Sequence, residues 1–257
     1  MHRTVDVPAV PKRIVSLVPS QTELLHHLGL EKEVIGITKF CVHPEKWFRQ
    51  KQRIGGTKNV DTEKVAALQP DLIIANKEEN VKEQIEELER NFPVWVSDVN
   101  TLQEAYAMMQ NIGKITNRES AADNLVQQLR NNFSQLQTPN TKHQTAYLIW
   151  KDPYMTVGSD TFIHHLLEVA GMANLFAGRL RYPAITIDEL QAANCQLLLL
   201  SSEPFPFRQK HVEELQQQLP STTVLLVDGE MFSWYGSRLL QAPAYFRHLQ
   251  HKIATLP

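Results

Sequence analysis

A serine near the start of the chain joins an apolar run to an amphipathic one, in RIVSLVPSQTELLHHLGL, residues 13–30. This position suits a nucleophile on a strand-to-helix turn, an anion-binding helix start or a helix cap. A nucleophile on such a turn requires flanking glycines in the pattern G-x-S-x-G. Here Ser20 lies between Pro19 and Gln21, and the pattern is absent. We therefore expect Ser20 to cap a helix, either alone or with free backbone N–H groups directed at a ligand.

The ten histidines do not have the spacing of metal ligands. His26-His27 and His164-His165 are adjacent pairs, and neighbours on a helix point about 100° apart. Ligand pairs on a helix stand three or four residues apart, as in H-E-x-x-H, a motif that does not occur here. The i, i+3 pair in HLQH, residues 248–251, has no carboxylate nearby. We therefore predict no metal site, no catalytic residues and no enzymatic activity such as metal-dependent hydrolysis.

The two cysteines, Cys41 and Cys195, are far apart in the sequence and fit no metal-binding spacing. We expect two independent buried thiols rather than a disulfide. The loop GGTKN, residues 55–59, has neither the P-loop nor the dinucleotide-binding spacing of glycines. It predicts a tight loop with a possible place at the edge of a cleft.

Aromatic side chains occur in three segments that each follow a strand-like run. The first follows the run ending at Trp150, the second is SSEPFPF at 201–207, and the third is DGEMFSWYGSR at 228–238. Open α/β sheets bind ligands at the carboxyl ends of their strands. Arg238, among the aromatic residues of the third segment, suits a large, flat and partly anionic ligand. The alternative for each segment is loop packing or a contact between domains.

The elements that position these residues alternate between strand and helix in the first hundred residues. Ser20 and Glu23 have the capping-box spacing, Gly29 ends that helix, and Asp61 or Thr62 caps a later one. Strands separated by helices imply a parallel sheet with helices on its faces. We expect strands at residues 13–18, 34–38, 70–75 and 93–98.

A helical stretch then separates this half from a second alternating half. Apolar residues recur with helical spacing from Thr101 to Leu136, and a break near Thr116-Asn117 indicates two helices. A flexible linker would be rich in Gly, Ser or Pro, so we expect the helical stretch to hold the halves at a nearly fixed separation. The fold class is α/β, with two lobes of mainly parallel sheets bridged by a long helix. The domains are an N-terminal lobe at 1–100, a helical bridge at 101–138 and a C-terminal lobe at 139–257.

In the second half we expect strands at 145–150, 196–202 and 223–228. Helices should occupy 160–171, 186–193 and 210–219, with a final helix from about Pro243.

The composition excludes several classes of protein. The chain of 257 residues is 42% hydrophobic and 21% charged, which is enough to bury a sizeable core. A net charge of −2 without a Lys/Arg stripe argues against nucleic-acid binding. The longest apolar run, LLLL at 197–200, is far shorter than the roughly 18 residues of a membrane helix. We expect no membrane span.

Three segments resemble the helical-backbone substrate-binding proteins of ABC importers, which bind cobalamin or ferric siderophores. They are PKRIVSLVPSQTELLHHLGL, KVAALQPDLIIANKEEN and, at the matching spacing, YMTVGSDTFIHHLLEVAG. The cobalamin-binding branch is the most similar, and the resemblance extends from Pro11 to the last helix. It implies two α/β lobes bridged by one long helix, the same organisation that the alternating runs indicate.

The resemblance also implies a ligand held between the lobes and surface glutamates that dock on arginines of a membrane permease. The docking residues would be Glu83 in the first lobe and Glu213 or Glu214 in the second. The ligand-binding residues carried over by position are Pro19, Ser20, Gln21, Phe40, Cys41, Thr57, Lys58, Asn76, Lys77, Trp150, Tyr154, Met155, Arg181, Tyr182, Phe205, Phe207, Phe232, Trp234 and Arg238.

Two positions depart from the cobalamin-binding pattern, because Thr57 and Asn76 stand where that branch has tryptophans. We therefore expect a monomeric binding protein without a resident cofactor, which captures a corrinoid or a ferric siderophore and delivers it to a permease. The alternative is a cytoplasmic sensor, chaperone or salvage protein with the same fold. The first residues, MHRTVDVPAVPKR, lack a basic segment followed by an apolar one. The family implies the periplasm or the cell surface, whereas a true start at Met1 implies the cytoplasm.

Overall fold

A computed structural model describes residues 5–7, 10–137 and 142–255 of the chain. The chain forms two compact units. The first extends to Val99 and also contains Gln103–Leu129 and Tyr235–Arg238. The second contains Asn100–Leu102, Arg130–Trp234 and the chain from Leu239 on. This division differs from the boundaries expected at residues 100 and 138, because most of the helical stretch packs with the first unit and Tyr235–Arg238 returns to it.

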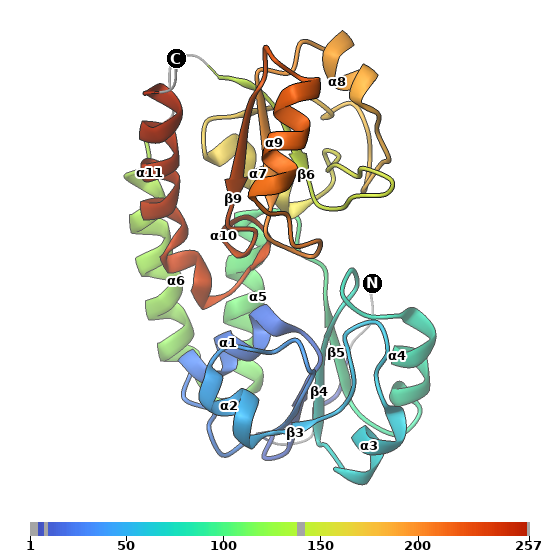
Figure 1. The fold of residues 1–257 in the computed structure, drawn as a ribbon. Helices are drawn as coiled ribbons and strands as arrows, with labels where there is room; N and C mark the ends of the chain where they lie inside the picture. The colour runs from blue at the N-terminus through green and yellow to red at the C-terminus, as the bar shows by residue number, and fades with distance from the viewer. Residues whose placement is uncertain (1–4, 8–9, 138–141, 256–257) are drawn as a thin grey trace. The chain divides into compact units, whose positions relative to one another are not determined.

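The sheet of the first unit is parallel, with the strand order β3-β2-β1-β4-β5 (Figure 1). The order reverses between β1 and β4, which is the position where doubly wound sheets open a crevice at their carboxyl edge. The four predicted strands are confirmed, and β3 is an additional strand of two residues. The strands are β1 (Ile14–Ser16), β2 (Val34–Ile37), β3 (Gln52–Arg53), β4 (Leu72–Asn76) and β5 (Val94–Ser97).

Apolar strand and helix positions form the core of the first unit. Val15, Ile73 and Val94 from the strands pack with Val65 and Ile85 from the helices. The helices of this part of the chain are α1 (Pro19–His27), α2 (Glu45–Gln50), α3 (Thr62–Ala67), α4 (Lys82–Glu89), α5 (Leu102–Ile115) and α6 (Glu119–Ser134).

The predicted break in the helical stretch is confirmed. α5 ends at Ile115, and Asn117 adopts a left-handed backbone conformation with φ = +56°. Asn tolerates this conformation better than most residues, so the chain can turn there and start α6. α6 begins in the first unit and ends in the second, and α5 also crosses the division, because its first residue, Leu102, belongs to the second unit.

The second unit has a parallel sheet in the order β7-β6-β8-β9 (Figure 1). The predicted strands and the four longer predicted helices are present, whereas β7 and α10, of two and four residues, are additional. The strands are β6 (Gln144–Leu148), β7 (Ala173–Asn174), β8 (Leu197–Ser201) and β9 (Thr223–Val227). The helices are α7 (Phe162–Val169), α8 (Ile187–Ala192), α9 (Gln209–Gln218), α10 (Glu230–Ser233), the 3-10 turn Ser237–Leu240 and α11 (Ala242–Ala254).

The start of α1 differs from the prediction. The N-cap residue is Val18, which makes no side-chain cap, and Pro19 occupies the first turn. Proline is well suited there because its missing N–H would have no partner and its φ is already helical. Ser20 lies inside the helix, and Glu23 bonds to Arg238 rather than to the backbone at the helix start. The predicted capping box is therefore wrong.

The end of α1 and the start of α3 agree with the predictions. Gly29 has φ = +76°, its N–H donates to the carbonyl of His26 at 2.9 Å, and the N–H of Leu30 donates to that of Leu25 at 3.1 Å. This is the Schellman arrangement that glycine favours. Asp61 caps α3 by accepting from the N–H of Lys64.

Candidate ligand-binding surfaces

The ligand residues predicted between Pro19 and Lys77 all lie at or just after the carboxyl ends of strands in the first unit. Pro19–Gln21 follow β1, Phe40-Cys41 follow β2, Thr57-Lys58 follow β3, and Asn76-Lys77 end and follow β4. Because the strands are parallel, these loops share one edge of the sheet, as the sequence indicates.

The side chains on this edge divide into an exposed and a buried group. Phe40 is 51% exposed, and Lys58 and Lys77 are also exposed. The exposed group can contact a ligand directly. The buried group, each at most 7% exposed, is Ser20, Gln21, Cys41, Thr57 and Asn76.

Two of the buried residues join the loops through Ser97, at the end of β5. The Ser97 Oγ accepts from Gln21 Nε2 at 2.5 Å and from Asn76 Nδ2 at 3.0 Å, and it donates to the Ala75 carbonyl at 3.2 Å. Asn80 Nδ2 donates to the carbonyls of Leu17 at 3.3 Å and Thr57 at 3.1 Å. Ser97 and Asn80 are not among the predicted site residues, because nothing in the local pattern shows that they connect loops far apart in the chain.

Cys41 is enclosed by hydroxyl groups. Thr22 Oγ1 donates to its Sγ at 3.1 Å, and Thr38 Oγ1 lies 3.2 Å from the same sulfur. Burial raises the pKa of the Cys41 thiol, so the unreactive protonated form is favoured. Burial also raises the pKa of the Cys195 thiol to about 11. Both cysteines are free and buried, which confirms the prediction of two independent thiols.

Arg238 is bound by a carboxylate of its own unit. Its Nε donates to Glu23 Oε2 at 2.9 Å and its Nη2 to Glu23 Oε1 at 2.6 Å, and the two side chains are only 11% and 18% exposed. The backbone of the same segment also lies close to α1 at Gly236, where an added Cβ would be 2.7 Å from the carbonyl oxygen of Ser20. Arg238 was predicted to bind an anionic ligand. Its guanidinium instead pairs with Glu23 and so holds the segment 235–238 against α1.

In the second unit an aromatic cluster lies at the carboxyl ends of β6 and β8. The rings of Trp150 and Phe205 are 5.8 Å apart and those of Phe205 and Phe207 are 4.8 Å apart, both edge-to-face. Trp150 is 42% exposed, Phe205 is half-buried and Phe207 is buried. Met155 pairs with Trp150 through the backbone. This cluster gives the second unit an apolar surface where a ligand could pack.

Phe232 and Trp234 are not part of that surface. Phe232 is fully buried against Tyr147 and Phe246, with ring distances of 5.2 and 4.9 Å. Trp234 is 6% exposed and its Nε1 donates to Glu203 Oε1 at 2.9 Å. Glu203 lies within the segment SSEPFPF but is not among the predicted site residues.

The remaining predicted residues of this unit lie beside the aromatic cluster or on the loop that pairs with it. Tyr154 is half-buried against the core. Arg181 is exposed with φ = +59°, its N–H donates to Asp160 Oδ1 at 2.5 Å, and its guanidinium lies 5.7 Å from the ring centre of Tyr182. The carboxylate of Asp160 thus holds an arginine in a backbone conformation that non-glycine residues seldom adopt.

The predicted docking glutamates are exposed. Glu83 lies in the first turn of α4, and Glu213 and Glu214 lie on α9. Glu214 accepts from Lys151 Nζ at 2.8 and 2.9 Å, which lowers the pKa of its carboxyl. For Glu83 and Glu213 the described ranges contain no hydrogen bond or ion pair of the side chain.

None of the helices in the described ranges combines the length and the apolar character that a bilayer crossing needs. Among the same residues, no three His, Cys, Asp or Glu side chains are grouped as a metal-ion site would require.

Residues 14–222 match the model of the periplasmic binding protein family, so the chain belongs to that family. This confirms the resemblance seen in the sequence motifs. A relative from Bacillus subtilis, named as an uncharacterised ABC transporter substrate-binding lipoprotein, is 27% identical over 75% of this chain and 64% of its own length. The vitamin B12-binding protein of Pectobacterium atrosepticum is 21% identical over 91% of this chain and 86% of its own length.

Solved structures share the fold across nearly the whole chain. The vitamin B12-binding protein of Vibrio cholerae has a TM-score of 0.75 and 20% identity, covering 95% of this chain and 99% of that one. A heme-binding protein from Roseiflexus has a TM-score of 0.79 and 18% identity, covering 92% of this chain and 98% of that one. The siderophore-binding protein BauB has a TM-score of 0.77 and 20% identity, covering 95% of this chain and 94% of that one. The α/β fold with two parallel sheets is thereby confirmed, and the proteins compared are binding proteins.

Proposed function

We propose that this chain is the substrate-binding protein of an ABC importer, which captures a metal chelate and delivers it to a membrane permease. The family match over residues 14–222 supports a binding role, and the names of the relatives support import of a chelate. One structural observation carries the proposal. Exposed aromatic residues stand at the carboxyl edges of both sheets, Phe40 in the first unit and Trp150 in the second.

The ligand is a corrinoid or a ferric siderophore, both of which offer a large apolar surface with polar groups at the rim. Trp150 and Phe205 supply aromatic contact, and the exposed Lys58 supplies a cation, whereas Lys77 is paired with Asp98. Thr57 and Asn76 are buried, so neither takes the place of the tryptophan planes of the cobalamin-binding branch. That difference favours a ligand that needs fewer stacking contacts than cobalamin.

Ligand titration tests the proposal. The purified chain is titrated with cyanocobalamin, ferrichrome and ferric enterobactin, while tryptophan fluorescence and the thermal midpoint are followed. We expect one of them to bind and to raise the midpoint, because a ligand that binds only the folded state stabilises it. No response to any of the three chelates would contradict the proposal.

Substitutions then locate the binding surface. Phe40→Ala and Trp150→Ala should each weaken binding by about tenfold or more, since loss of a well-packed aromatic contact commonly costs over 1 kcal/mol. Leu226→Ala is the matched control, because Leu226 is an exposed apolar residue on β9, outside the predicted loops. Equal affinities for all four proteins would show that the ligand binds elsewhere.

A further inference from the structure

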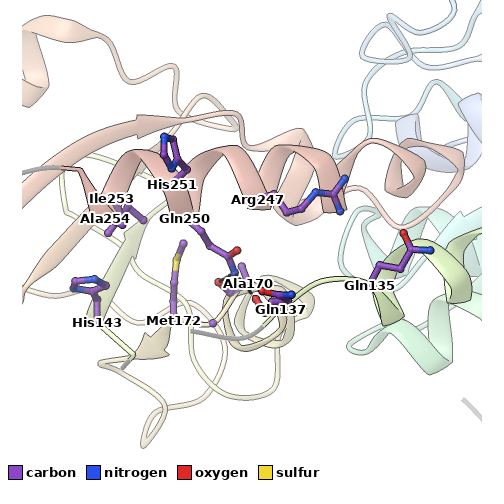
Figure 2. Close-up of a pocket in the computed structure, with 11 residues that line it drawn as sticks. Gln135, Gln137, His143, Ala170, Met172, Arg247, Gln250, His251, Ile253 and Ala254 are labelled. Carbon is purple, nitrogen blue, oxygen red and sulfur yellow. Dashed lines mark hydrogen bonds between the residues drawn. The ribbon is translucent and has the colours of Figure 1, made fainter. Parts of the chain in front are cut away.

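A pocket of about 550 Å³ lies in the second unit, away from the surfaces described above (Figure 2). His143, on its rim, directly precedes β6, and Met172 directly precedes β7. The pocket is therefore at the amino edge of the parallel sheet, whereas Trp150 and Phe205 follow the carboxyl ends of β6 and β8. Its size is within the range of about 300–1,000 Å³ typical of small-molecule sites.

One face of α11 forms a wall of this pocket. Arg247, Gln250, His251 and Ala254 line it, and their spacing of i, i+3, i+4 and i+7 places them on one side of the helix. The apolar stripe of the same helix, which includes Phe246 and Leu249, is buried in the unit. α11 thus has one face in the core and a second, basic face at the pocket.

The side chains that line the pocket include three basic groups and no carboxylate. Among the described residues, Arg247, His143 and His251 form no side-chain hydrogen bond or ion pair, and α11 contains no Asp or Glu. The two other arginines described above each have a carboxylate partner, Glu23 for Arg238 and Asp160 for Arg181. A guanidinium without a partner on a concave surface attracts anions, and its planar fork matches a carboxylate.

Helix ends near the pocket do not cancel this charge. The carboxyl end of a helix carries partial negative charge, and α7 ends at this site. Gln250 Nε2, however, donates to the carbonyls of Ala170 at 3.0 Å and Gln137 at 3.2 Å, as Figure 2 shows. These carbonyls are already hydrogen-bonded, so the positive charge of Arg247 remains the main electrostatic feature.

Three glutamines, Gln135, Gln137 and Gln250, also line the pocket, and the rest of the lining is apolar. Ala170 and Met172 are buried, at 1% and 2% exposed, and Ile253 and Ala254 are contributed by the last turn of α11. Figure 2 shows Met172 directed from its strand start toward α11. An inorganic anion would leave this surface without contacts. An anion with a hydrocarbon body would use both the guanidinium and the apolar lining.

We propose that this pocket is a second ligand site, for a small amphipathic carboxylate whose charged group pairs with Arg247 and whose hydrocarbon part packs on Met172 and Ile253. The site is independent of the proposed import function, because none of its lining residues belongs to the surfaces assigned to the chelate.

Isothermal titration calorimetry with 4-phenylbutyrate tests the site, with 4-phenylbutyramide as the uncharged probe of nearly the same shape. We expect the carboxylate to bind and the amide to bind at least tenfold more weakly. Arg247→Gln should weaken carboxylate binding at least tenfold. Arg90→Gln, an exposed arginine of the first unit, is the matched control and should leave it unchanged.

A second variant fills the volume of the pocket and leaves the charge of Arg247 in place. Ala254 is exposed near the end of α11, so Ala254→Trp should fill the pocket without disturbing the fold, which circular dichroism would verify. We expect it to abolish binding of 4-phenylbutyrate. Absence of binding to the wild type, equal binding of acid and amide, or full binding by either variant would overturn the proposal.

Discussion

A single carboxylate, Glu203, joins the loop after β8 to the segment at the end of α10. Its Oε1 accepts from Ser233 Oγ at 2.6 Å and from Trp234 Nε1 at 2.9 Å. Burial raises the pKa of this carboxyl above the ordinary 4.5, and the neighbouring Glu230 and Asp228 act in the same direction. The folded protein therefore holds the proton of Glu203 to a higher pH than the unfolded chain does. Ionised Glu203 opposes folding, so stability should fall as pH rises from 4.5 through the folded-state pKa.

We expect Glu203→Gln to raise the free energy of unfolding at pH 7, because the amide keeps an oxygen acceptor for Ser233 and Trp234 without a buried charge. The gain should shrink toward pH 4.5, where the wild-type carboxyl is protonated in the folded protein and partly so in the unfolded chain. Urea unfolding between pH 4 and 8 measures both effects. Glu213→Gln, at an exposed carboxylate, is the control. A variant no more stable than the wild type at pH 7 would contradict the argument.

The Glu23–Arg238 pair is largely buried and bidentate, so removal of one partner leaves the other without compensation. We expect Glu23→Gln and Arg238→Met each to lower the free energy of unfolding by about 2–4 kcal/mol. The double variant should lose less than the sum, because the second substitution removes the unpaired charge. Chemical denaturation of the four proteins gives this cycle.

The control for this cycle is the exposed pair Lys82–Glu86, at 3.5 Å on α4. Glu86→Gln should cost under about 0.5 kcal/mol, as surface pairs on helices do. Single-variant losses at Glu23 and Arg238 as small as that of Glu86→Gln would show that the buried pair contributes nothing.

The starts of α1 and α7 are capped differently. Ser20 follows Pro19 inside α1 and caps nothing, whereas the side chain of Thr161 accepts from the N–H of His164 at the start of α7. We expect Ser20→Ala to change the free energy of unfolding by less than about 0.5 kcal/mol. Thr161→Ala should lower it by about 1 kcal/mol. Thermal and urea unfolding measure both, and an equal loss for both variants would restore Ser20 as a cap.

The elements show which parts of the fold a sequence can predict. Long apolar runs such as those of β4 and β8 identify buried strands, and Gly29 identifies a helix end, because both effects act within a few residues. β3, of two residues, is too short to produce a pattern. The capping box at Ser20 failed because Glu23 bonds to Arg238, 215 residues further along the chain. A contact at that separation leaves no local signal.

The position of the candidate surfaces could be predicted from the sequence, but the direction of their side chains could not. Topology alone places Cys41 and Asn76 at the carboxyl edge of the first sheet and Phe232 after β9. Their burial depends on partners elsewhere, such as Ser97 for Asn76 and Tyr147 for Phe232. Phe40 and Trp150 are exposed, whereas other phenylalanine and tryptophan residues are buried. Only the packed structure distinguishes the exposed aromatic residues from the buried ones.

Delivery to a permease would require a docking residue on each unit, and the exposed Glu83 on α4 and Glu213 on α9 are the proposed docking residues. Glu214 is less suited, since its carboxylate is bound to Lys151. Exposed charges at the rim of an interface act mainly on the rate of association, and salt screens them. We expect the double variant Glu83→Ala, Glu213→Ala to reduce, by several-fold, the stimulation of ATP hydrolysis in an importer that the wild-type chain activates. The reduction should be largest at low ionic strength, and chelate affinity should not change.

The matched control for docking is the double variant Glu63→Ala, Asp188→Ala, which removes one exposed carboxylate from each unit at α3 and α8 and changes the net charge equally. It should stimulate the importer as the wild type does, because its substitutions leave α4 and α9 intact. ATPase activity is measured in proteoliposomes at two salt concentrations, with chelate affinity measured in parallel on the free proteins. Equal losses in the two double variants would mean that net charge, and not the docking of two particular glutamates, governs the encounter.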